Sequence, residues 1–245
     1  VIAGGQFNAT TGTFSTVNGG RGNTAGAGYT IVGGGLANRA GTDYAIAGGG
    51  YRNEALGLMS TLAGGGNNNV GNRYATASGG RYNTASGISS TVSGGYNNTA
   101  SATDATVGGG FRNSAPGYRS TGGGGFANVT TGSYSLVAGG RENQASATYA
   151  TVGGGYANIT SGSVATVAGG SRNTAGDSSA TVAGGSENVA RGLYAAIGGG
   201  FRNSTTATAT GSTIGGGTSN RVGYRYATVG GGTLNTANGN SATVA

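Results

Sequence analysis

The sequence predicts an all-β protein, a parallel β-solenoid (β-roll) of about sixteen coils that are each about fifteen residues long. Two observations carry this prediction: an Asn recurs every fifteen residues, and Gly occupies the positions four and three residues before it in every coil. A third is composition, because the 245 residues include 58 Gly, five Phe and no Trp. Bulky apolar side chains are too few for a conventional globular core.

The recurring Asn, which we call the frame Asn, defines the coils. A two-residue insertion near residues 205–212 shifts the last two of them. The consensus is T-V-x-G-G-x-x-N-x-A-x-G-x-Y-A, with a branched apolar residue six positions before the frame Asn and a small residue two positions after it. We expect one repeat domain over residues 1–245. The frame residues are Asn8, Asn23, Asn38, Asn53, Asn68, Asn83, Asn98, Asn113, Asn128, Asn143, Asn158, Asn173, Asn188, Asn203, Asn220 and Asn235.

Two short strands are expected in each coil, one around Y-A-T-V and one around N-x-A, with Gly-rich corners between them. Alternation within Y-A-T-V places Ala and Val in the interior and Tyr and Thr outside. A helix is excluded because each interior Gly costs about 1 kcal/mol relative to Ala. Collagen is excluded because Gly is not every third residue and Pro116 is the only proline. Successive coils should pair in parallel, about 4.8 Å apart.

The frame Asn residues are expected to form a ladder, in which each side-chain amide bonds the amide or backbone of the next coil. This role is structural. Because the ladder turns the frame Asn side chains away from solvent, N-linked glycans are not expected at the Asn-x-Thr sites that contain a frame Asn. The ladder is predicted most directly at Asn38, Asn53, Asn98, Asn113, Asn143, Asn158, Asn173 and Asn188.

Charge and residue types exclude several classes of function. The net charge of +7 comes from 13 Arg against six carboxylates, but charged residues form only 8% of the chain and no basic run, so no nucleic-acid partner is predicted. The chain lacks Cys, His and Lys, and its carboxylates are scattered. No catalytic residue, metal site, cofactor or enzyme activity is therefore predicted. The sequence contains no stretch of 18 apolar residues, so no segment of it is expected to cross a membrane.

One coil carries a resemblance to a known family. The residues of Thr106 to Gly117, T-V-G-G-G-F-R-N-S-A-P-G, resemble the S-V-A-I-G-x-x-A-x-A-x-G head repeat of trimeric autotransporter adhesins, the YadA-like or haemagglutinin-type head repeats. The resemblance implies a left-handed β-roll, three chains around one axis, and display on a bacterial surface. Two family positions differ, because the family's Ile is Gly here and its Ala is the frame Asn.

Two columns of side chains are candidates for self-association or surface binding. The column five residues before the frame Asn holds only small residues, including Gly108 and Gly153, and is either a chain-to-chain contact or the tightest internal corner. The column six residues after it is rich in aromatics, which could brace the surface, join chains, or dock a sugar or protein. This Tyr column includes Tyr29, Tyr44, Tyr74, Tyr134, Tyr149 and Tyr194.

Arginine recurs within single columns as well. Arg172, Glu187 and Arg202 form one alternating series on adjacent coils, and such exposed pairs contribute about 0 to 1 kcal/mol each. Arg21, Arg81 and Arg141 recur four coils apart, as do Arg52, Arg112 and Arg172; the period would suit contacts between fibres or an anionic glycan.

The leading hypothesis is an extracellular structural and adhesive fibre on a bacterial surface, part of a longer fibrous protein. Its partners would be further copies of the chain, as a homotrimer or an end-to-end filament, and host matrix, a cell surface or a glycan. An ice-binding solenoid is the rival, because a Thr column runs from Thr16 to Thr181 with few gaps, although its outward neighbour is Tyr rather than a second Thr. A phage or virion fibre segment is a further alternative, because it would be built from stacked coils in the same way.

Overall fold

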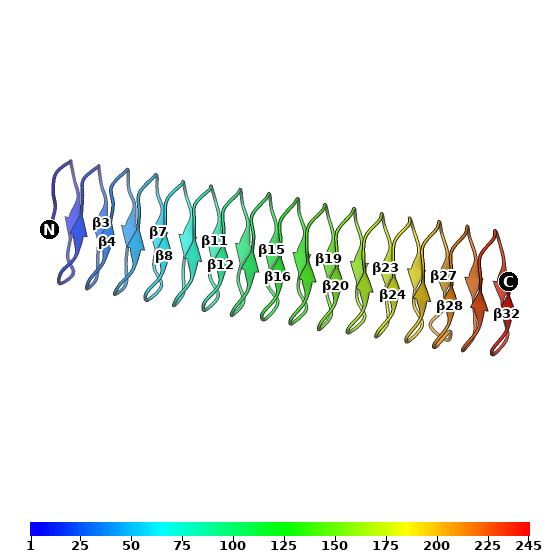
Figure 1. Ribbon diagram of the computed structural model, residues 1–245. Helices are drawn as coiled ribbons and strands as arrows, with labels where there is room; N and C mark the ends of the chain where they lie inside the picture. Colours follow the sequence, from blue (N-terminus) through cyan, green and yellow to red (C-terminus); the bar gives the residue numbers. More distant parts are fainter. The chain divides into compact units, whose positions relative to one another are not determined.

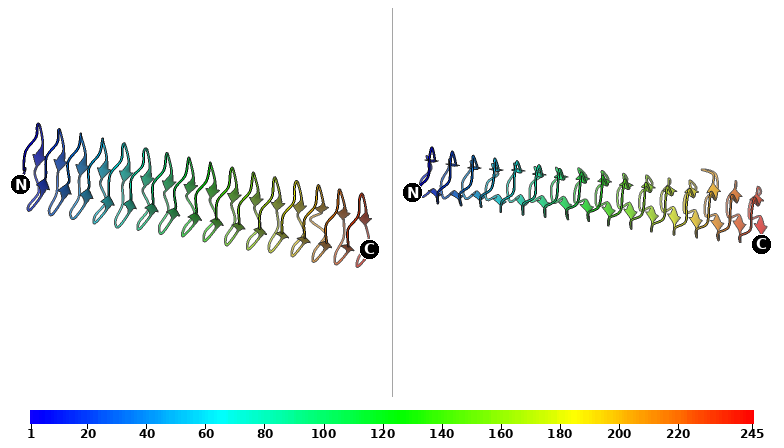
Figure 2. Two further views of the ribbon diagram at one scale, coloured as in Figure 1. Left: turned by 45° about the horizontal axis from the view of Figure 1, so that its top comes forward. Right: turned by 90° about the horizontal axis from the view of Figure 1, so that it is seen from above.

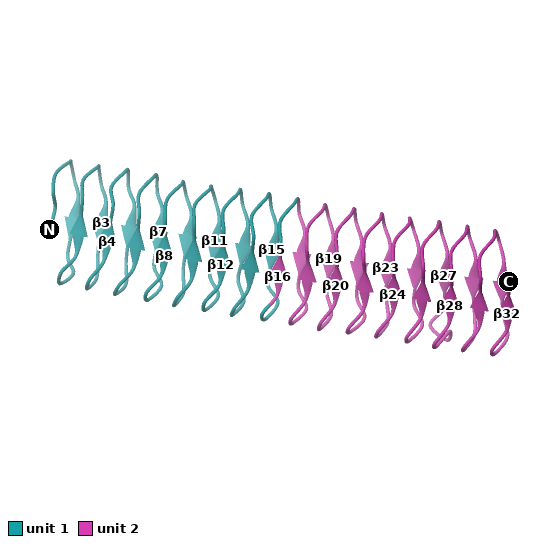
Figure 3. Cartoon of the chain, viewed as in Figure 1, with its two compact units in different colours: residues 1–119, 123–125 teal, residues 120–122, 126–245 magenta.

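The fold class is confirmed by a computed structural model that describes all 245 residues. It contains no helix, and its short parallel strands stack as a β-solenoid of about sixteen turns with partners about fifteen residues apart. The chain forms two compact units, which Figure 3 distinguishes by colour. Unit 1 comprises residues 1–119 and 123–125, and unit 2 comprises residues 120–122 and 126–245.

Unit 1 contains two parallel sheets, one of odd-numbered and one of even-numbered strands (Figure 1). Neighbouring strands pair in register at fifteen residues, as Thr91 does with Thr106. The strands are β1 (Ala9–Thr10), β2 (Thr16–Val17), β3 (Thr24–Ala25), β4 (Ile31–Val32), β5 (Arg39–Ala40), β6 (Ile46–Ala47), β7 (Glu54–Ala55), β8 (Thr61–Leu62), β9 (Asn69–Val70), β10 (Thr76–Ala77), β11 (Thr84–Ala85), β12 (Thr91–Val92), β13 (Thr99–Ala100), β14 (Thr106–Val107) and β15 (Ser114–Ala115).

Unit 2 repeats this construction, again with one sheet of even-numbered and one of odd-numbered strands. Its strands are β16 (Thr121–Gly122), β17 (Val129–Thr130), β18 (Leu136–Val137), β19 (Gln144–Ala145), β20 (Thr151–Val152), β21 (Ile159–Thr160), β22 (Thr166–Val167), β23 (Thr174–Ala175), β24 (Thr181–Val182), β25 (Val189–Ala190), β26 (Ala196–Ile197), β27 (Ser204–Thr205), β28 (Thr213–Ile214), β29 (Arg221–Val222), β30 (Thr228–Val229), β31 (Thr236–Ala237) and β32 (Thr243–Val244).

The interior of each unit is filled by the second residue of nearly every strand. In β14 and β15, for example, Val107 and Ala115 are fully buried while Thr106 and Ser114 are half-buried on the outside. The Ala that precedes the Thr-Val strand, such as Ala105, is buried as well. Figure 2 shows the two rows of strands within each unit, and these small side chains fill the space between them. The predicted inward position of Ala and Val is confirmed.

The two invariant Gly columns differ in the space around their Cβ positions, although most residues of both columns have a positive φ. Gly50 has φ of +90°, and a Cβ there would collide with the carbonyl oxygen of Gly65 in the next coil and with Nδ2 of Asn53. Gly64 lies in the neighbouring column and has open space around its Cβ position. The column three residues before the frame Asn is therefore closed to side chains by both conformation and space.

Two further corners use the left-handed backbone region without Gly. The residue before the frame Asn and the residue of the Tyr column have φ between 50° and 61° in nearly every coil, as at Arg52 and Tyr44. Such φ values are uncommon for residues other than Gly, Asn and Asp, and Val164 is the least suited because it is β-branched. The sequence analysis assigned the tight corners to the Gly-rich columns and did not anticipate this.

The predicted two-residue insertion lies between β27 and β28. Across it, Ser204 pairs with Arg221, which is seventeen residues away instead of fifteen. The hydroxyls of Thr206 and Thr208 in the inserted turn both donate to the carbonyl oxygen of Gly223, at 2.9 and 2.7 Å. The extra residues are thus accommodated in one turn while the strand register is kept.

Candidate binding surfaces

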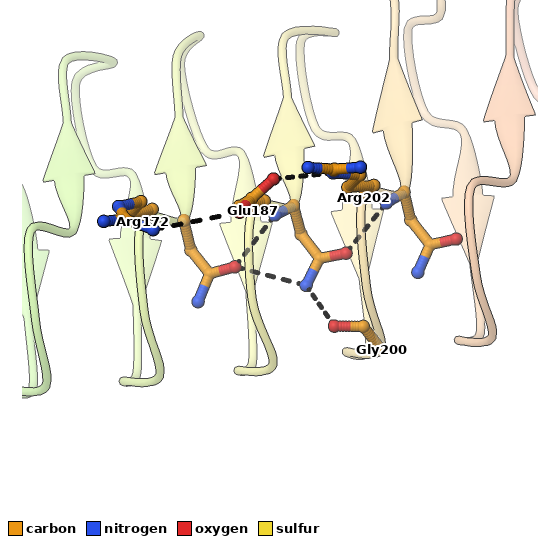
Figure 4. Close-up of polar contacts among 7 residues, drawn as sticks. Arg172, Glu187, Gly200 and Arg202 are labelled. Carbon is orange, nitrogen blue, oxygen red and sulfur yellow. Dashed lines mark hydrogen bonds and ion pairs between the residues drawn. The ribbon is translucent and has the colours of Figure 1, made fainter.

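The frame Asn side chains are buried and hydrogen-bonded, apart from the half-buried Asn8 and Asn235 in the first and last coils. The backbone N–H of Asn188 donates to Oδ1 of Asn173 at 3.0 Å, and Oδ1 of Asn188 accepts the N–H of Asn203 at 3.0 Å (Figure 4). Nδ2 of Asn188 donates to the carbonyl oxygens of Gly184 in its own coil and Gly200 in the next, at 3.0 and 2.9 Å. Each side-chain amide therefore joins its own coil to the next, and the backbone N–H of the same residue binds the amide of the previous coil.

The same arrangement recurs at the other predicted ladder positions, and at each of them the side chain is at most 1% exposed. Nδ2 always donates to the carbonyl oxygens of the Gly four residues before it and the Gly of the next coil. Burial leaves these residues inaccessible to a partner. The ladder positions predicted from the sequence are Asn38, Asn53, Asn98, Asn113, Asn143, Asn158, Asn173 and Asn188.

The Tyr column lies on the surface in both units. In unit 1 the rings of Phe14, Tyr29 and Tyr44 stack one on the next with centroids 5.2 and 4.9 Å apart, and Tyr74 stands further along the column. In unit 2 the rings of Tyr134 and Tyr149 stack at 5.0 Å. All of these side chains are exposed, as is Tyr194, whose ring has no aromatic neighbour in its column. The column combines internal stacking with a free outer surface.

The small-residue column has a geometric reason within the chain. A Cβ on Gly108 would collide with the carbonyl oxygen of Gly123 in the next coil, and a Cβ on Gly153 would collide with that of Ala168. These two Gly residues allow the backbone of successive coils to approach each other. Both Gly residues are exposed, and Ala occupies the same column in other coils, as at Ala63 and Ala168, so the column stands as a candidate for either the internal corner or a chain-to-chain contact.

A second aromatic surface, which the sequence analysis did not identify, lies at the corner just before the frame Asn. It combines the columns two and one residues before that Asn, and in each of four coils of unit 1 a guanidinium lies over an aromatic ring. The pairs are Arg21 over Phe7 at 5.7 Å, Arg52 over Tyr51 at 5.0 Å, Arg81 over Tyr82 at 5.0 Å and Arg112 over Phe111 at 5.1 Å. We call these residues, with the intervening Leu36 and Tyr96, the arginine–aromatic strip of unit 1.

Unit 2 has a corresponding strip in which carboxylates accompany the arginines. Glu187 bonds Nε of Arg202 at 2.7 Å and lies 3.9 Å from Nη1 of Arg172 (Figure 4). Glu142 bonds Nε of Arg141 at 3.0 Å. Rings of the same corner also stack with these guanidiniums, among them Phe126, Tyr156 and Phe201. The charge of this second strip is largely balanced, unlike that of the first.

The signal for the strip was present in the sequence but was divided between two columns. Considered singly, each column shows Arg at a four-coil period up to Arg172. Considered together, the two columns place one Arg in every second coil from Arg21 to Arg202. The two columns face the same side because the residue before the frame Asn has a positive φ, whereas neighbouring residues of an extended strand would point to opposite faces. The series is Arg21, Arg52, Arg81, Arg112, Arg141, Arg172 and Arg202.

The structure has no pocket, and no three His, Cys, Asp or Glu side chains converge to hold a metal ion. It has no helix able to span a bilayer. No protein-family model matches the sequence, and a comparison with curated proteins finds no relative. The exposed columns are the candidates that the geometry offers.

Proposed function

We propose that this chain is a segment of an extracellular structural and adhesive fibre on a bacterial surface, without catalytic activity, which associates with further copies of itself through solenoid faces and contacts other cells or surfaces. The observation that supports the proposal is the exposed Tyr column. Parallel strands two residues long, paired from coil to coil, give a regular scaffold, and on it aromatic rings recur at a fixed position of the coil.

Exposed aromatic rings are well suited to bury surface between chains. Tyr29 and Tyr44 are about half exposed, at 49% and 48%, although their rings stack on each other. Tyr is enriched at protein interfaces because it combines a large apolar body with a hydroxyl that can find a partner. A second solenoid with the same column would offer a matching surface in the same register.

The resemblance to trimeric autotransporter head repeats supports the same proposal. It implies three chains around one axis in a left-handed β-roll, and the Tyr column is the surface that we assign to the contact between chains. A filament of chains is the other form of self-association that the sequence predicts, and the test below separates the two by mass and by shape.

The test compares the wild-type chain with Tyr29→Ser/Tyr44→Ser by analytical ultracentrifugation and negative-stain electron microscopy. Wild-type chain is expected to sediment as a trimer or a larger filament, and the variant as a smaller species with the same circular dichroism. Ile88→Ser/Tyr224→Ser is the matched control, because both side chains are exposed and lie outside the Tyr column. Wild-type chain that remains monomeric at every concentration would overturn the self-association.

Ice binding is the second candidate, and one observation favours it. Thr61, Thr76, Thr91 and Thr106 pair in register on four successive strands of unit 1, so their hydroxyls recur at about the strand spacing of 4.8 Å. The residues two positions further along the chain are Ala63, Ser78, Ser93 and Gly108, so a second row of hydroxyls is only partly present. Thermal hysteresis of the purified chain would support ice binding, and its absence would leave the fibre as the proposed function.

A further inference from the structure

We propose that the arginine–aromatic strip of unit 1 binds an acidic polysaccharide whose carboxylates or sulfates are widely spaced along the chain. This inference deepens the surface-binding part of the proposed function and rests on it. It concerns a different surface from the Tyr column, so the two can fail independently.

The first argument is charge. The strip of unit 1 carries the guanidiniums of Arg21, Arg52, Arg81 and Arg112, and its two columns contain no carboxylate in this unit. The acidic residues of unit 1 stand elsewhere in the coil: Asp104 in the Tyr column, Asp43 in the column just before it, and Glu54 in the column after the frame Asn. The ion pairs of the protein involve Arg119, Arg141, Arg172 and Arg202, and none of the four strip arginines. The row of positive charge therefore has no counter-charge from the protein.

The second argument is the orientation of the guanidiniums. Each of the four is exposed and lies with its central carbon 5.0 to 5.7 Å from the centre of an aromatic ring. Stacking covers one face of a planar guanidinium and leaves N–H groups at its edge able to bind an anion, and at Arg81 one of them also donates to Oη of Tyr82 at 3.4 Å. That edge is the part which bonds a carboxylate or sulfate in a bidentate manner. The ring holds the guanidinium in place and lowers the entropy lost when an anion binds.

The third argument is the apolar surface between the charges. Leu36 and Tyr96 stand on the strip in the coils between arginines and are exposed, and the rings of Tyr96 and Phe111 stack at 5.0 Å. Aromatic side chains present flat apolar faces on which the apolar face of a sugar ring can pack. Alternating cations and apolar faces match a chain of sugars that bears an anion at intervals.

The fourth argument is charge density, which separates a polysaccharide from a nucleic acid. One arginine per two coils places the cations about 9.6 Å apart, twice the strand spacing of about 4.8 Å. Duplex DNA carries one charge per about 1.7 Å of axis, so it would present five or more phosphates for each strip arginine. An acidic polysaccharide with one carboxylate per disaccharide has a repeat of comparable length to the arginine spacing. The strip therefore fits the sparser polyanion.

The test measures binding of the full chain to immobilised hyaluronan, which has one carboxylate per disaccharide, by biolayer interferometry. Neutral dextran and oligothymidylate serve as the comparison ligands. The strip variant is R21Q/R52Q/R81Q/R112Q. The matched control is R39Q/R73Q/R221Q/R225Q, which removes the same charge from four exposed arginines outside the strip. A third variant, E142Q/E187Q, frees the arginines of unit 2.

Wild-type chain is expected to bind hyaluronan, and the strip variant to bind at least about tenfold more weakly, because several contacts to one polymer are lost together. The control variant should stay within about twofold, because net charge alone acts weakly on a sparse polyanion. The glutamate variant should bind more tightly than wild type, and dextran should not bind.

Equal losses in the strip and control variants would overturn the inference, as would tighter binding of wild type to oligothymidylate or no binding to hyaluronan. Sedimentation of the strip variant keeps this outcome separate from the proposed function. A strip variant that assembles like wild type but does not bind hyaluronan supports the inference. If the strip variant also fails to assemble, the strip lies between chains, and the polysaccharide-binding inference is overturned.

Discussion

The backbone N–H of Asn53 donates a hydrogen bond of 3.0 Å to the side-chain Oδ1 of Asn38, which stands fifteen residues earlier in the same column. Both side chains are at most 1% exposed. One amide thus supplies the acceptor that the next coil's backbone needs, while its Nδ2 supplies a donor to the carbonyl oxygens of Gly34 and Gly50 at 2.7 and 2.9 Å. The ladder thus satisfies the N–H of Asn53 and the carbonyl oxygen of Gly34, which have no backbone partner.

Replacing Asn38 by Ala removes the acceptor of the buried N–H of Asn53. The loss of this hydrogen bond alone is expected to destabilise the fold by about 1–3 kcal/mol. The carbonyl oxygen of Gly50 keeps a second donor, the N–H of Leu36, so it contributes less to the loss. The measurement is the free energy of unfolding from urea titration. Asn18→Ala is the control: Asn18 is exposed, and other coils have Ala in its column. Equal effects of the two substitutions would contradict the role of the ladder.

Gly50 and Gly64, which lie in the two adjacent Gly columns, are expected to differ in their tolerance of Ala. Gly50→Ala should cost more than about 2 kcal/mol, because the residue has φ of +90° and its Cβ would meet the carbonyl oxygen of Gly65. Gly64→Ala should cost less than about 1 kcal/mol, since its Cβ position is open and its φ lies outside the range of +20° to +160° that disfavours L-residues. The loss of stability of each variant relative to the wild type is measured by thermal unfolding, followed by circular dichroism. A larger loss for Gly64→Ala would show that the steric account is wrong.

Much of the fold followed from the repeat because each coil is nearly the same length. A fixed Asn with two Gly before it defined the coil, and alternation in Y-A-T-V placed Val107 and Ala105 inside, where both are fully buried. Strand positions could be predicted because small and branched residues alternate there. The buried ladder also followed from its column, since an invariant polar residue in so thin an interior needs partners along the stack.

The backbone at the corners could not be predicted, and the arginine–aromatic strip was missed for that reason. Arg52 and Tyr51 would point to opposite faces of an extended strand, yet their side chains stack at 5.0 Å. The cause is the φ of 50° at Arg52, and Arg has no preference for that region. Asn67 and Asn97 in the same column are the only polar hints, because Asn tolerates a positive φ better than most residues.

The positive φ at this corner predicts a substitution that stabilises the fold. Ala37 has φ of 57° and is exposed, in the column where Asn67 and Asn97 occur. Ala37→Asn is expected to raise the stability by about 0.5–1 kcal/mol, because a left-handed conformation costs an L-residue about 1–2 kcal/mol and Asn relieves part of it. The melting temperature reports the gain. Ala63→Asn, at an exposed position without a positive φ, should show no gain, and a similar rise there would indicate a general effect of Asn.

The ion pair between Glu187 and Arg202 is expected to contribute little to stability and to depend on salt. Nε of Arg202 lies 2.7 Å from Oε2 of Glu187, but the side chains remain 61% and 31% exposed. A double-mutant cycle of Glu187→Gln and Arg202→Gln should therefore give a coupling energy of about 0.2–1 kcal/mol, measured by urea unfolding.

Salt should reduce this coupling, because the screening length falls from about 10 Å at 0.1 M to about 3 Å at 1 M. Glu187 also faces Arg172, at 3.9 Å, so Glu187→Gln alone should cost slightly more than Arg202→Gln alone. A coupling energy that is large, or that does not change in high salt, would mean that the pair is shielded from solvent. That result would place the corner of unit 2 inside a contact rather than on a free surface.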